Sequence, residues 1–113
     1  WQDVDESFKH CQPYAEQIIT GRKRIEYRTW PTKFRGEFLI HAALRKEAGA
    51  ENLPRGGIVG RVTLADCRLG ADGIYRFHLI KPKRMRFVAV TGRLGFFEVP
   101  DKLLRRVRRV RKA

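Results

Sequence analysis

Hydrophobic and polar residues alternate with a period of two in several short stretches of the chain, a pattern that predicts strands. The expected strands cover residues 7–11, 37–43, 58–67, 74–80 and 86–90. Gly70, Asp72 and Gly73 predict a turn before the fourth of these strands, and Pro82 predicts a break before the fifth. Gly60, within one of the longest candidates, predicts a bulge or a close approach of the backbone.

One helix is predicted early in the chain. Pro13 suits a first helical turn, apolar residues follow up to Ile19, and Gly21 suits the end of the helix. Residues 42–52 are rich in Ala, Glu and Lys and predict either a helical turn or a mobile loop. Five or six short strands with one early helix favour a small barrel.

The segment GRKRIEYR contains the most unusual strand pattern. Ile25 and Tyr27 alternate with charged residues, so one face is apolar and the other is ionic. The charged residues include Lys23, Glu26 and Arg28, a cluster typical of a cleft that holds an anion or a nucleobase. The alternative is a solvated strand face whose charges neutralise one another in cross-strand pairs.

A basic amphipathic helix is predicted after Pro100. Its apolar positions, at helical spacing, are Leu103, Leu104, Val107 and Val110. Its basic residues are Arg105, Arg106, Arg108, Arg109, Arg111 and Lys112. We interpret this helix either as a phosphate-binding arm or as a helix packed on the barrel, and a membrane surface or a calmodulin-like partner would suit it similarly.

The length of 113 residues leaves room for one domain, placed at residues 1–100, with the basic helix or tail at 101–113. The chain carries 25 Lys and Arg against 12 Asp and Glu, a net charge of +13. This charge favours a partner with phosphates, and nucleic acid is the first candidate. A membrane surface is the competing polyanion, but no apolar run approaches the roughly 20 residues of a spanning helix, and no apolar segment near the start predicts a signal peptide.

Cysteine and histidine content predicts no metal site. Cys11 and Cys67 lie far apart and His10, His41 and His78 are scattered, whereas a zinc site needs about four clustered ligands. The adjacent His10 and Cys11 supply at most half of such a site. Buried, reduced thiols in a cytoplasmic protein without a cofactor are expected.

Lys23, Glu26 and Arg28 support either binding or catalysis. Arg28 can hold a phosphate through a two-pronged hydrogen-bond fork, and Lys23 can supply a charge or, with a lowered pKa, a general base. Glu26 can orient Lys23, accept a proton or read a base edge. Metal-free cleavage of RNA needs a further proton-transfer group, and His41 on the next strand is the nearest histidine candidate; the alternative for His41 is a half-buried histidine hydrogen-bonded to the backbone.

Trp30 precedes a proline at a predicted turn, and Arg28, Lys33 and Arg35 flank it. Its ring could stack on an unpaired base while these cations hold the nucleic-acid backbone. Packing of Trp30 against the barrel is equally compatible with the sequence.

Five segments, taken in order, resemble the ASCH domain, a family of the PUA-like superfamily of RNA-associated β-barrels. They are SFKHCQPYAEQIITG, GRKRIEYR (which fits the motif G-x-K-x-x-E-x-R), TWPTKFRGEFLIHAA, GGIVGRVTLADC and GRLGFFEVP. The resemblance implies an α+β fold, a small mixed β-barrel of five to six strands flanked by helices. The tail after Pro100 lies outside the resemblance.

The resemblance also implies binding of RNA or nucleotides in a cleft that contains the motif residues. Some members cleave single-stranded RNA, others hydrolyse the acetyl amide of acetylated cytidine, and one branch belongs to transcription coactivators. The deacetylating members are thought to use a Lys, a Thr three residues later and a distant Glu. Lys23 matches the Lys, but Glu26 stands in place of the Thr, which disfavours amide hydrolysis because a carboxylate cannot simply replace the hydroxyl nucleophile.

Three functional hypotheses are compatible with these residues. The first is a domain that binds RNA, above all single-stranded RNA and less favourably DNA. The second is a metal-independent ribonuclease or modified-nucleoside hydrolase in which Lys23 and Glu26 transfer protons. The third is a coactivator-type interaction module whose tail meets an acidic protein. The predicted binding residues are Lys23, Glu26, Arg28, Trp30, Lys33, Arg35, His41, Arg105, Arg106, Arg108 and Arg109.

Overall fold

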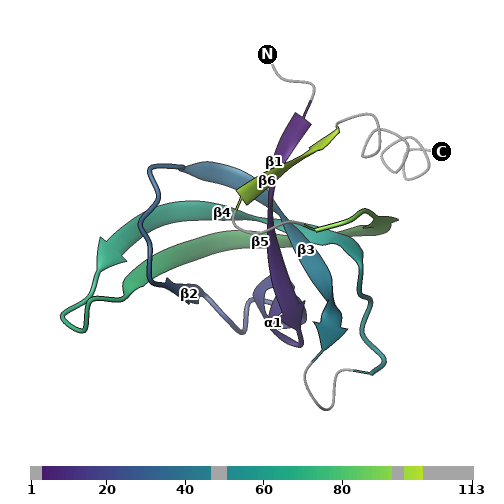
Figure 1. Cartoon of the computed structure of the whole chain (residues 1–113), viewed down its shortest axis with the longest axis horizontal. Coiled ribbons are helices and arrows are strands. Elements are labelled where there is room, and N and C mark those ends of the chain that lie inside the picture. The colour runs from purple at the N-terminus through teal and green to yellow at the C-terminus, as the bar shows by residue number, and fades with distance from the viewer. Residues whose placement is uncertain (1–3, 47–50, 93–95, 101–113) are drawn as a thin grey trace.

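The computed structural model describes residues 4–46, 51–92 and 96–100, with the backbone alone for residues 4–8, 46 and 96–100. These ranges contain one six-stranded sheet and one short helix (Figure 1). In chain order the elements are β1 (Val4–Gln12), α1 (Tyr14–Ile19), β2 (Ile25–Arg28), β3 (Gly36–Lys46), β4 (Gly57–Leu69), β5 (Tyr75–Ala89) and β6 (Phe96–Pro100).

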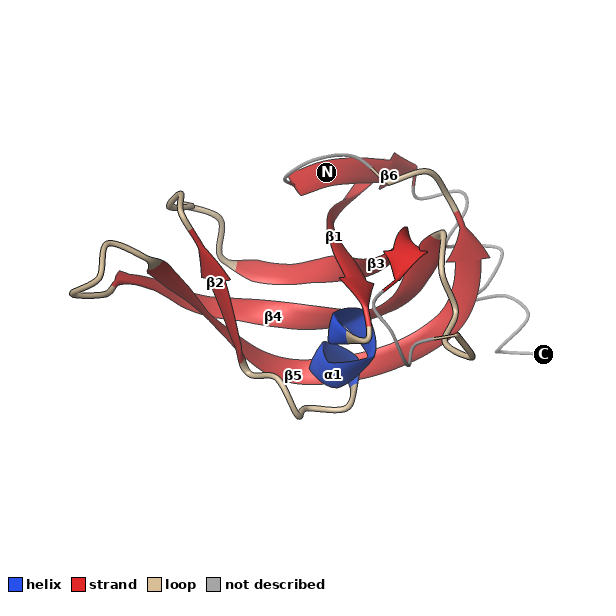
Figure 2. Ribbon diagram, turned by 60° about the horizontal axis from the view of Figure 1, so that its bottom comes forward, coloured by secondary structure: helices blue, strands red, loops and turns tan. Residues whose placement is uncertain are grey.

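The sheet is mixed and strongly curved. Its strand order is β2-β5-β4-β3-β1-β6, in which β1 and β3 are parallel and the other neighbours are antiparallel. Figure 2 shows the long strands β3, β4 and β5 bending around α1. The result is a half-barrel, which confirms the predicted mixed barrel of five to six strands, although α1 is its single helix in the described ranges. The predicted basic helix at 101–113 lies outside the described residues.

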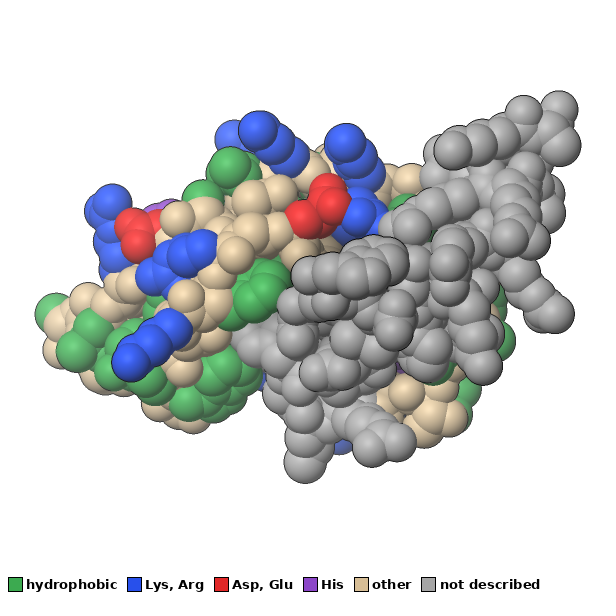
Figure 3. All heavy atoms as spheres, turned by 90° about the horizontal axis from the view of Figure 1, so that it is seen from above, with side chains coloured by type: hydrophobic (Ala, Val, Ile, Leu, Met, Phe, Trp, Pro, Cys, Tyr) green, Lys and Arg blue, Asp and Glu red, His purple; other side chains and the backbone are tan. Residues whose placement is uncertain are grey.

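Basic side chains are prominent on the surface (Figure 3). Several acidic side chains of the described part are paired with them, as in the pairs of Arg61 with Glu37 and of Arg68 with Asp66. No helix in the described part of the chain is long and apolar enough to cross a membrane. The acidic residues thus leave a surplus of positive charge on the fold.

Pairing between strands overrides two local predictions. The strands predicted at 74–80 and 86–90 merge into the single strand β5 (Tyr75–Ala89), which continues through Pro82, so the predicted break is wrong. Register shifts between β4 and β5 absorb the irregularity near Lys81, whose φ is 53°, and Pro82. Residues 42–46 extend β3 instead of forming a helical turn, because β1 continues to pair with β3 as far as Lys46, beyond the last β4 pair at Ala42.

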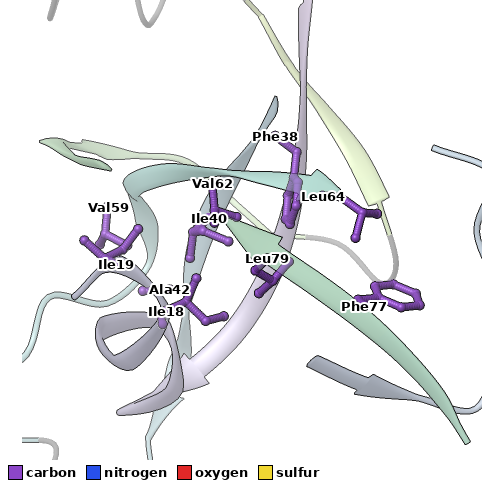
Figure 4. Packing of buried hydrophobic residues seen from close by; sticks show 11 residues of the cluster. Ile18, Ile19, Phe38, Ile40, Ala42, Val59, Val62, Leu64, Phe77 and Leu79 are labelled. Carbon is purple, nitrogen blue, oxygen red and sulfur yellow. The ribbon is translucent and has the colours of Figure 1, made fainter. Parts of the chain in front are cut away.

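The core lies between α1 and the concave face of the sheet (Figure 4). Its fully or nearly fully buried side chains include Ile18, Phe38, Ile40, Val62, Leu64, Phe77 and Leu79. Two polar contacts fix the helix. The backbone N–H of Glu16 donates to Gln12 Oε1 at 3.0 Å, and the guanidinium of Arg84 on β5 donates two hydrogen bonds to the carboxylate of Glu16. Because α1 is held at both its start and its outer face, the segment that follows it has a defined position.

Gly60 on β4 confirms the predicted bulge and close approach. The register of β4 against β5 shifts between Ile58 and Gly60. A Cβ atom at Gly60 would lie 2.3 Å from the carbonyl oxygen of Lys83 and 2.5 Å from Ile19 Cδ1. The absence of a side chain at this position therefore lets both β5 and α1 pack on β4.

We expect Gly60→Ala to destabilise the fold by roughly 1–3 kcal/mol, because the added methyl group must displace backbone atoms of β5. The half-buried Thr63 on the same strand provides the control, and Thr63→Ala should cost less than about 1 kcal/mol. Urea unfolding of the two variants measures the difference. Equal free energies of unfolding for both variants would contradict the close-packing argument.

Candidate functional site

Glu26 is the centre of a polar cluster beneath the surface of the half-barrel. It lies on β2, and only 6 % of the residue is exposed, whereas its neighbour Tyr27 is 53 % exposed. The predicted alternation is therefore present, but the ionic side of β2 faces inward and the aromatic side faces solvent. This orientation differs from that of an ordinary half-buried strand, in which the apolar face is the buried one.

Backbone hydrogen bonds hold the segment between α1 and β2. The N–H of Lys23 donates to the carbonyl of Gln17 on α1 at 2.9 Å. The N–H of Leu79 on β5 donates to the carbonyl of Arg24 at 2.8 Å, just before the ladder that pairs Glu26 with Phe77. The position of Lys23 is thus set by α1 on one side and by β5 on the other.

Three basic side chains contact the carboxylate of Glu26. The Nε2 atom of His10 on β1 contacts Oε2 of Glu26. The Nζ atom of Lys23 lies 3.4 Å from Oε1, and Nη2 of Arg28 lies 3.4 Å from Oε2. Lys23 and Arg28 come from the segment around β2, but His10 comes from a strand on the far side of the sheet order, so the tertiary fold assembles the cluster.

The surroundings of Glu26 keep it ionised. Burial raises the pKa of its carboxyl group, but the hydrogen bond and charge of His10, followed by the charges of Arg28 and Lys23, outweigh burial and lower the pKa to about 2. At neutral pH the cluster therefore contains a carboxylate with the cations of Lys23 and Arg28 and the imidazole of His10 around it.

A pocket of about 290 Å³ opens beside this cluster. The side chains that line it are those of Lys9, His10, Cys11, Tyr14, Lys23, Glu26 and Arg28. The side chains of Lys23 and Arg28 are 24 % and 30 % exposed, whereas those of His10 and Glu26 are almost fully buried. The Nζ atom of Lys23 also lies 5.1 Å from the centre of the Tyr14 ring, a cation–π contact. The cations thus form the rim of the pocket, and the His10–Glu26 pair forms its floor.

The other predicted residues lie in different surroundings. Trp30 packs edge-on against the core residue Phe77, with ring centres 5.3 Å apart, and borders a neighbouring hollow. Arg35 donates hydrogen bonds to the carbonyls of Thr32 and Phe34 and lies 3.7 Å from a carboxylate oxygen of Asp66. Lys33 is exposed. Arg105, Arg106, Arg108 and Arg109 lie outside the described residues.

His41 does not line the pocket of Glu26. It is buried on β3, its Nε2 lies 2.6 Å from the carbonyl oxygen of Val90, and burial lowers its pKa. It borders a different hollow of about 510 Å³, beside Leu44 and Gly92. This geometry fits the alternative role of a strand histidine bonded to the backbone, although His41 is fully rather than half buried.

His10 is the histidine that the sequence pattern did not place in the cluster. The pattern shows it only as a neighbour of Cys11, and no group of His, Cys, Asp or Glu in the described part of the chain is arranged to hold a metal. The available signal was the polar residue pair His10 and Gln12, one in the strand predicted at 7–11 and the other directly after it. Both side chains are buried, which is unusual for polar residues without a specific partner.

In its described residues the chain has a curved mixed sheet around one short helix, a fold that matches an ASCH/PUA-like barrel. The family model of the ASCH domain matches residues 9–75, more than half of the chain, and the chain belongs to this family. The region matched includes β2 and the three contacts of Glu26.

Solved structures of similar fold come from Zymomonas mobilis. The ASCH protein of that organism superposes with a TM-score of 0.66 at 10% sequence identity, covering 96% of this chain and 96% of that chain. A serine-to-alanine mutant gives a TM-score of 0.66 at 11% identity and covers 93% of this chain and 94% of its own. A tyrosine-to-phenylalanine mutant of the same ASCH protein gives a TM-score of 0.63 at 9% identity and covers 93% of this chain and 96% of its own. No curated protein matches the sequence. At these identities the likeness establishes the fold.

We expect Glu26→Gln to destabilise the fold most above about pH 5 and progressively less toward pH 2. A folded-state pKa of about 2, below the ordinary 4.5, stabilises the fold above the ordinary value, and this contribution disappears as the pH falls through the folded value. The difference between the two pKa values corresponds to roughly 3 kcal/mol of folding stability. Urea unfolding of the wild type and the variant at several pH values between 7 and 2 measures this contribution.

The exposed carboxylate of Glu37, paired with Arg61, provides the control. Glu37→Gln should change the free energy of unfolding by less than about 1 kcal/mol at any of these pH values, because surface pairs contribute little. A Glu26→Gln difference that stays constant from pH 7 to pH 2 would contradict the assigned role of the cluster.

Proposed function

We propose that this domain binds single-stranded RNA and holds one nucleotide in the pocket of Lys23, Glu26 and Arg28. The carrying observation is that the carboxylate of Glu26 is enclosed by His10, Lys23 and Arg28, while Lys23 and Arg28 keep part of their side chains exposed on the pocket rim. The ASCH family, to which the chain belongs, is generally linked to RNA and nucleic-acid binding.

Hydrogen-bond capacity supports an anionic ligand. A lysine ammonium has three N–H donors and a guanidinium has five, so one carboxylate cannot use all the donors of Lys23 and Arg28. Lys9 adds a further positive charge to the pocket lining. The charge of the described cluster is therefore positive even with Glu26 ionised, and the chain as a whole carries +13. A phosphate group matches this arrangement in charge and in geometry.

The size of the pocket supports a single nucleotide unit. Ligand pockets usually measure about 300–1,000 Å³, and the pocket of about 290 Å³ lies just below the lower limit of this range. The ring of Tyr14 offers an apolar surface in the lining. A base can enter such a pocket only when it is unstacked, which favours a single strand over a duplex. DNA fits the same charge less specifically.

The free thiols of Cys11 and Cys67 suit a cytoplasmic location.

Binding is favoured over catalysis by the state of the acidic group. A carboxylate with a pKa of about 2 is a weak general base near neutral pH. The contact of His10 with Glu26 favours the second candidate, a metal-independent ribonuclease or modified-nucleoside hydrolase, because a carboxylate that orients a histidine recurs in catalytic sites. The side chain of His10 is only 2 % exposed, so it lies in the floor of the pocket, where little of its surface can reach a bound ligand.

We expect Lys23→Ala and Arg28→Ala each to weaken binding of a short single-stranded RNA about tenfold or more, as befits the loss of a charge-assisted hydrogen bond. Arg86→Ala is the control. It removes an exposed cation on β5 that does not line the pocket, and it should change the dissociation constant less than about threefold. Fluorescence anisotropy at one fixed salt concentration measures the three constants. Each lost phosphate contact should also reduce the log–log salt slope by about 0.7.

Two results would count against the proposal. Equal weakening by all three substitutions would assign the affinity to diffuse surface charge, and equal affinity for a duplex RNA of the same length would exclude an unstacked base in the pocket. The same samples are run on a denaturing gel after incubation. Cleavage by the wild type that disappears with Lys23→Ala would establish the ribonuclease instead.

A further inference from the structure

A second hollow lies directly beside the pocket of Glu26. It measures about 500 Å³, and its lining includes Tyr27, Arg28, Trp30, Ile74 and Arg76. Arg28 lines both hollows. Because Arg28 also contacts Glu26, its guanidinium is held at the boundary between the two spaces.

Tyr27 and Arg76 form a platform on the outer side of this second hollow. They face each other in the register of β2 and β5, and the guanidinium carbon of Arg76 lies 5.2 Å from the centre of the Tyr27 ring. Two hydrogen bonds to Asp72, at 2.6 and 3.2 Å, and one to the carbonyl of Ile74 at 2.7 Å fix the guanidinium. The ring is more than half exposed and is supported from one side by a positioned cation, which is suitable for stacking a base.

Trp30 supplies a second aromatic surface in the same hollow. Its ring meets that of Phe77 at 81°, an edge-to-face contact with the core that restrains its orientation. Two restrained aromatic rings with Arg28 and Arg76 beside them form a combination of stacking surface and positive charge. This combination is typical of sites for single-stranded nucleic acid, which bind bases through stacking and the backbone through cations.

We propose that the hollow between Tyr27 and Trp30 binds the base of the nucleotide adjacent to the one in the Glu26 pocket, with Arg28 contacting the phosphate between them. The inference rests on the proposed function and adds to it the smallest ligand that fills both hollows. The ligand is then at least a dinucleotide segment of single-stranded RNA. The neighbouring base leaves the stack of its own strand and gains an aromatic stack on the protein.

The test measures the affinity of a single-stranded RNA octanucleotide for variants of the full chain. Tyr27→Ala should weaken binding about 5- to 150-fold, the range for the loss of one stacked base, and Tyr27→Phe should retain most of the affinity. Phe87→Ala provides the matched control. It removes an exposed aromatic ring on β5, away from both hollows, and should leave the affinity unchanged. Tyr27 is exposed, so its replacement leaves the core intact.

Tryptophan fluorescence gives a second measurement. The chain has two tryptophans, Trp1 and Trp30, so Trp1→Phe makes Trp30 the single emitter. We expect the emission of Trp30 to be quenched when this variant is saturated with the octanucleotide. Wild-type affinity in Tyr27→Ala or unchanged emission at saturation would overturn the second subsite. Displacement of the RNA by an acidic peptide that quenches Trp30 equally well would also overturn it in favour of a protein ligand.

Lys23→Ala separates the failure of this inference from the failure of the proposed function. If Lys23→Ala weakens binding while Tyr27→Ala does not, the Glu26 pocket binds RNA and the second subsite is wrong. If Lys23→Ala leaves the affinity unchanged, the proposed function itself is wrong. The second subsite is then wrong as well, because it is defined as the neighbour of the Glu26 pocket.

Discussion

The carboxylate of Glu26 is the group on which the arrangement of the site depends. Removing a buried carboxylate from water is expensive, and the cost is offset only when cations and hydrogen-bond donors surround it. Here the donors come from β1, from the segment after α1 and from β2 itself. The need to compensate one buried charge therefore fixes the relative positions of three segments, and the cationic rim of the pocket is a consequence of that compensation.

The location of β2 explains why a charged strand can turn its ionic side inward. β2 is short and lies at the edge of the sheet, where it pairs with β5 alone. The apolar core is centred on α1 and the central strands and reaches β2 through Phe77, the partner of Glu26 in the register. The sheet edge therefore accommodates a polar cluster without a large loss of apolar burial, and Tyr27 is left exposed on the outside.

The sequence pattern predicted most of the strands and the single early helix, because alternation and glycine positions are local signals. It also placed Lys23, Glu26 and Arg28 in one cluster, because they lie close together in the chain. It did not predict the role of His10, since the contact with Glu26 depends on how β1 and β2 are placed in the curved sheet. The path of β5 through Pro82 was missed for a related reason. A proline alone predicts a break, and the register shift that accommodates Pro82 depends on the pairing of β5 with β4.

In the proposed function, Arg28 links the stability of the cluster to the binding of the ligand. Its contact with Glu26 restrains a side chain that would otherwise lose much rotational freedom on binding, so the entropic cost of ordering it is already met in the folded protein. The five donors of the guanidinium allow it to contact Glu26 and a phosphate at once. A lysine at this position could supply the charge but not the fixed planar geometry. In the proposed function, Glu26 therefore contributes to anion binding through the cations it positions, even though its own charge opposes the ligand.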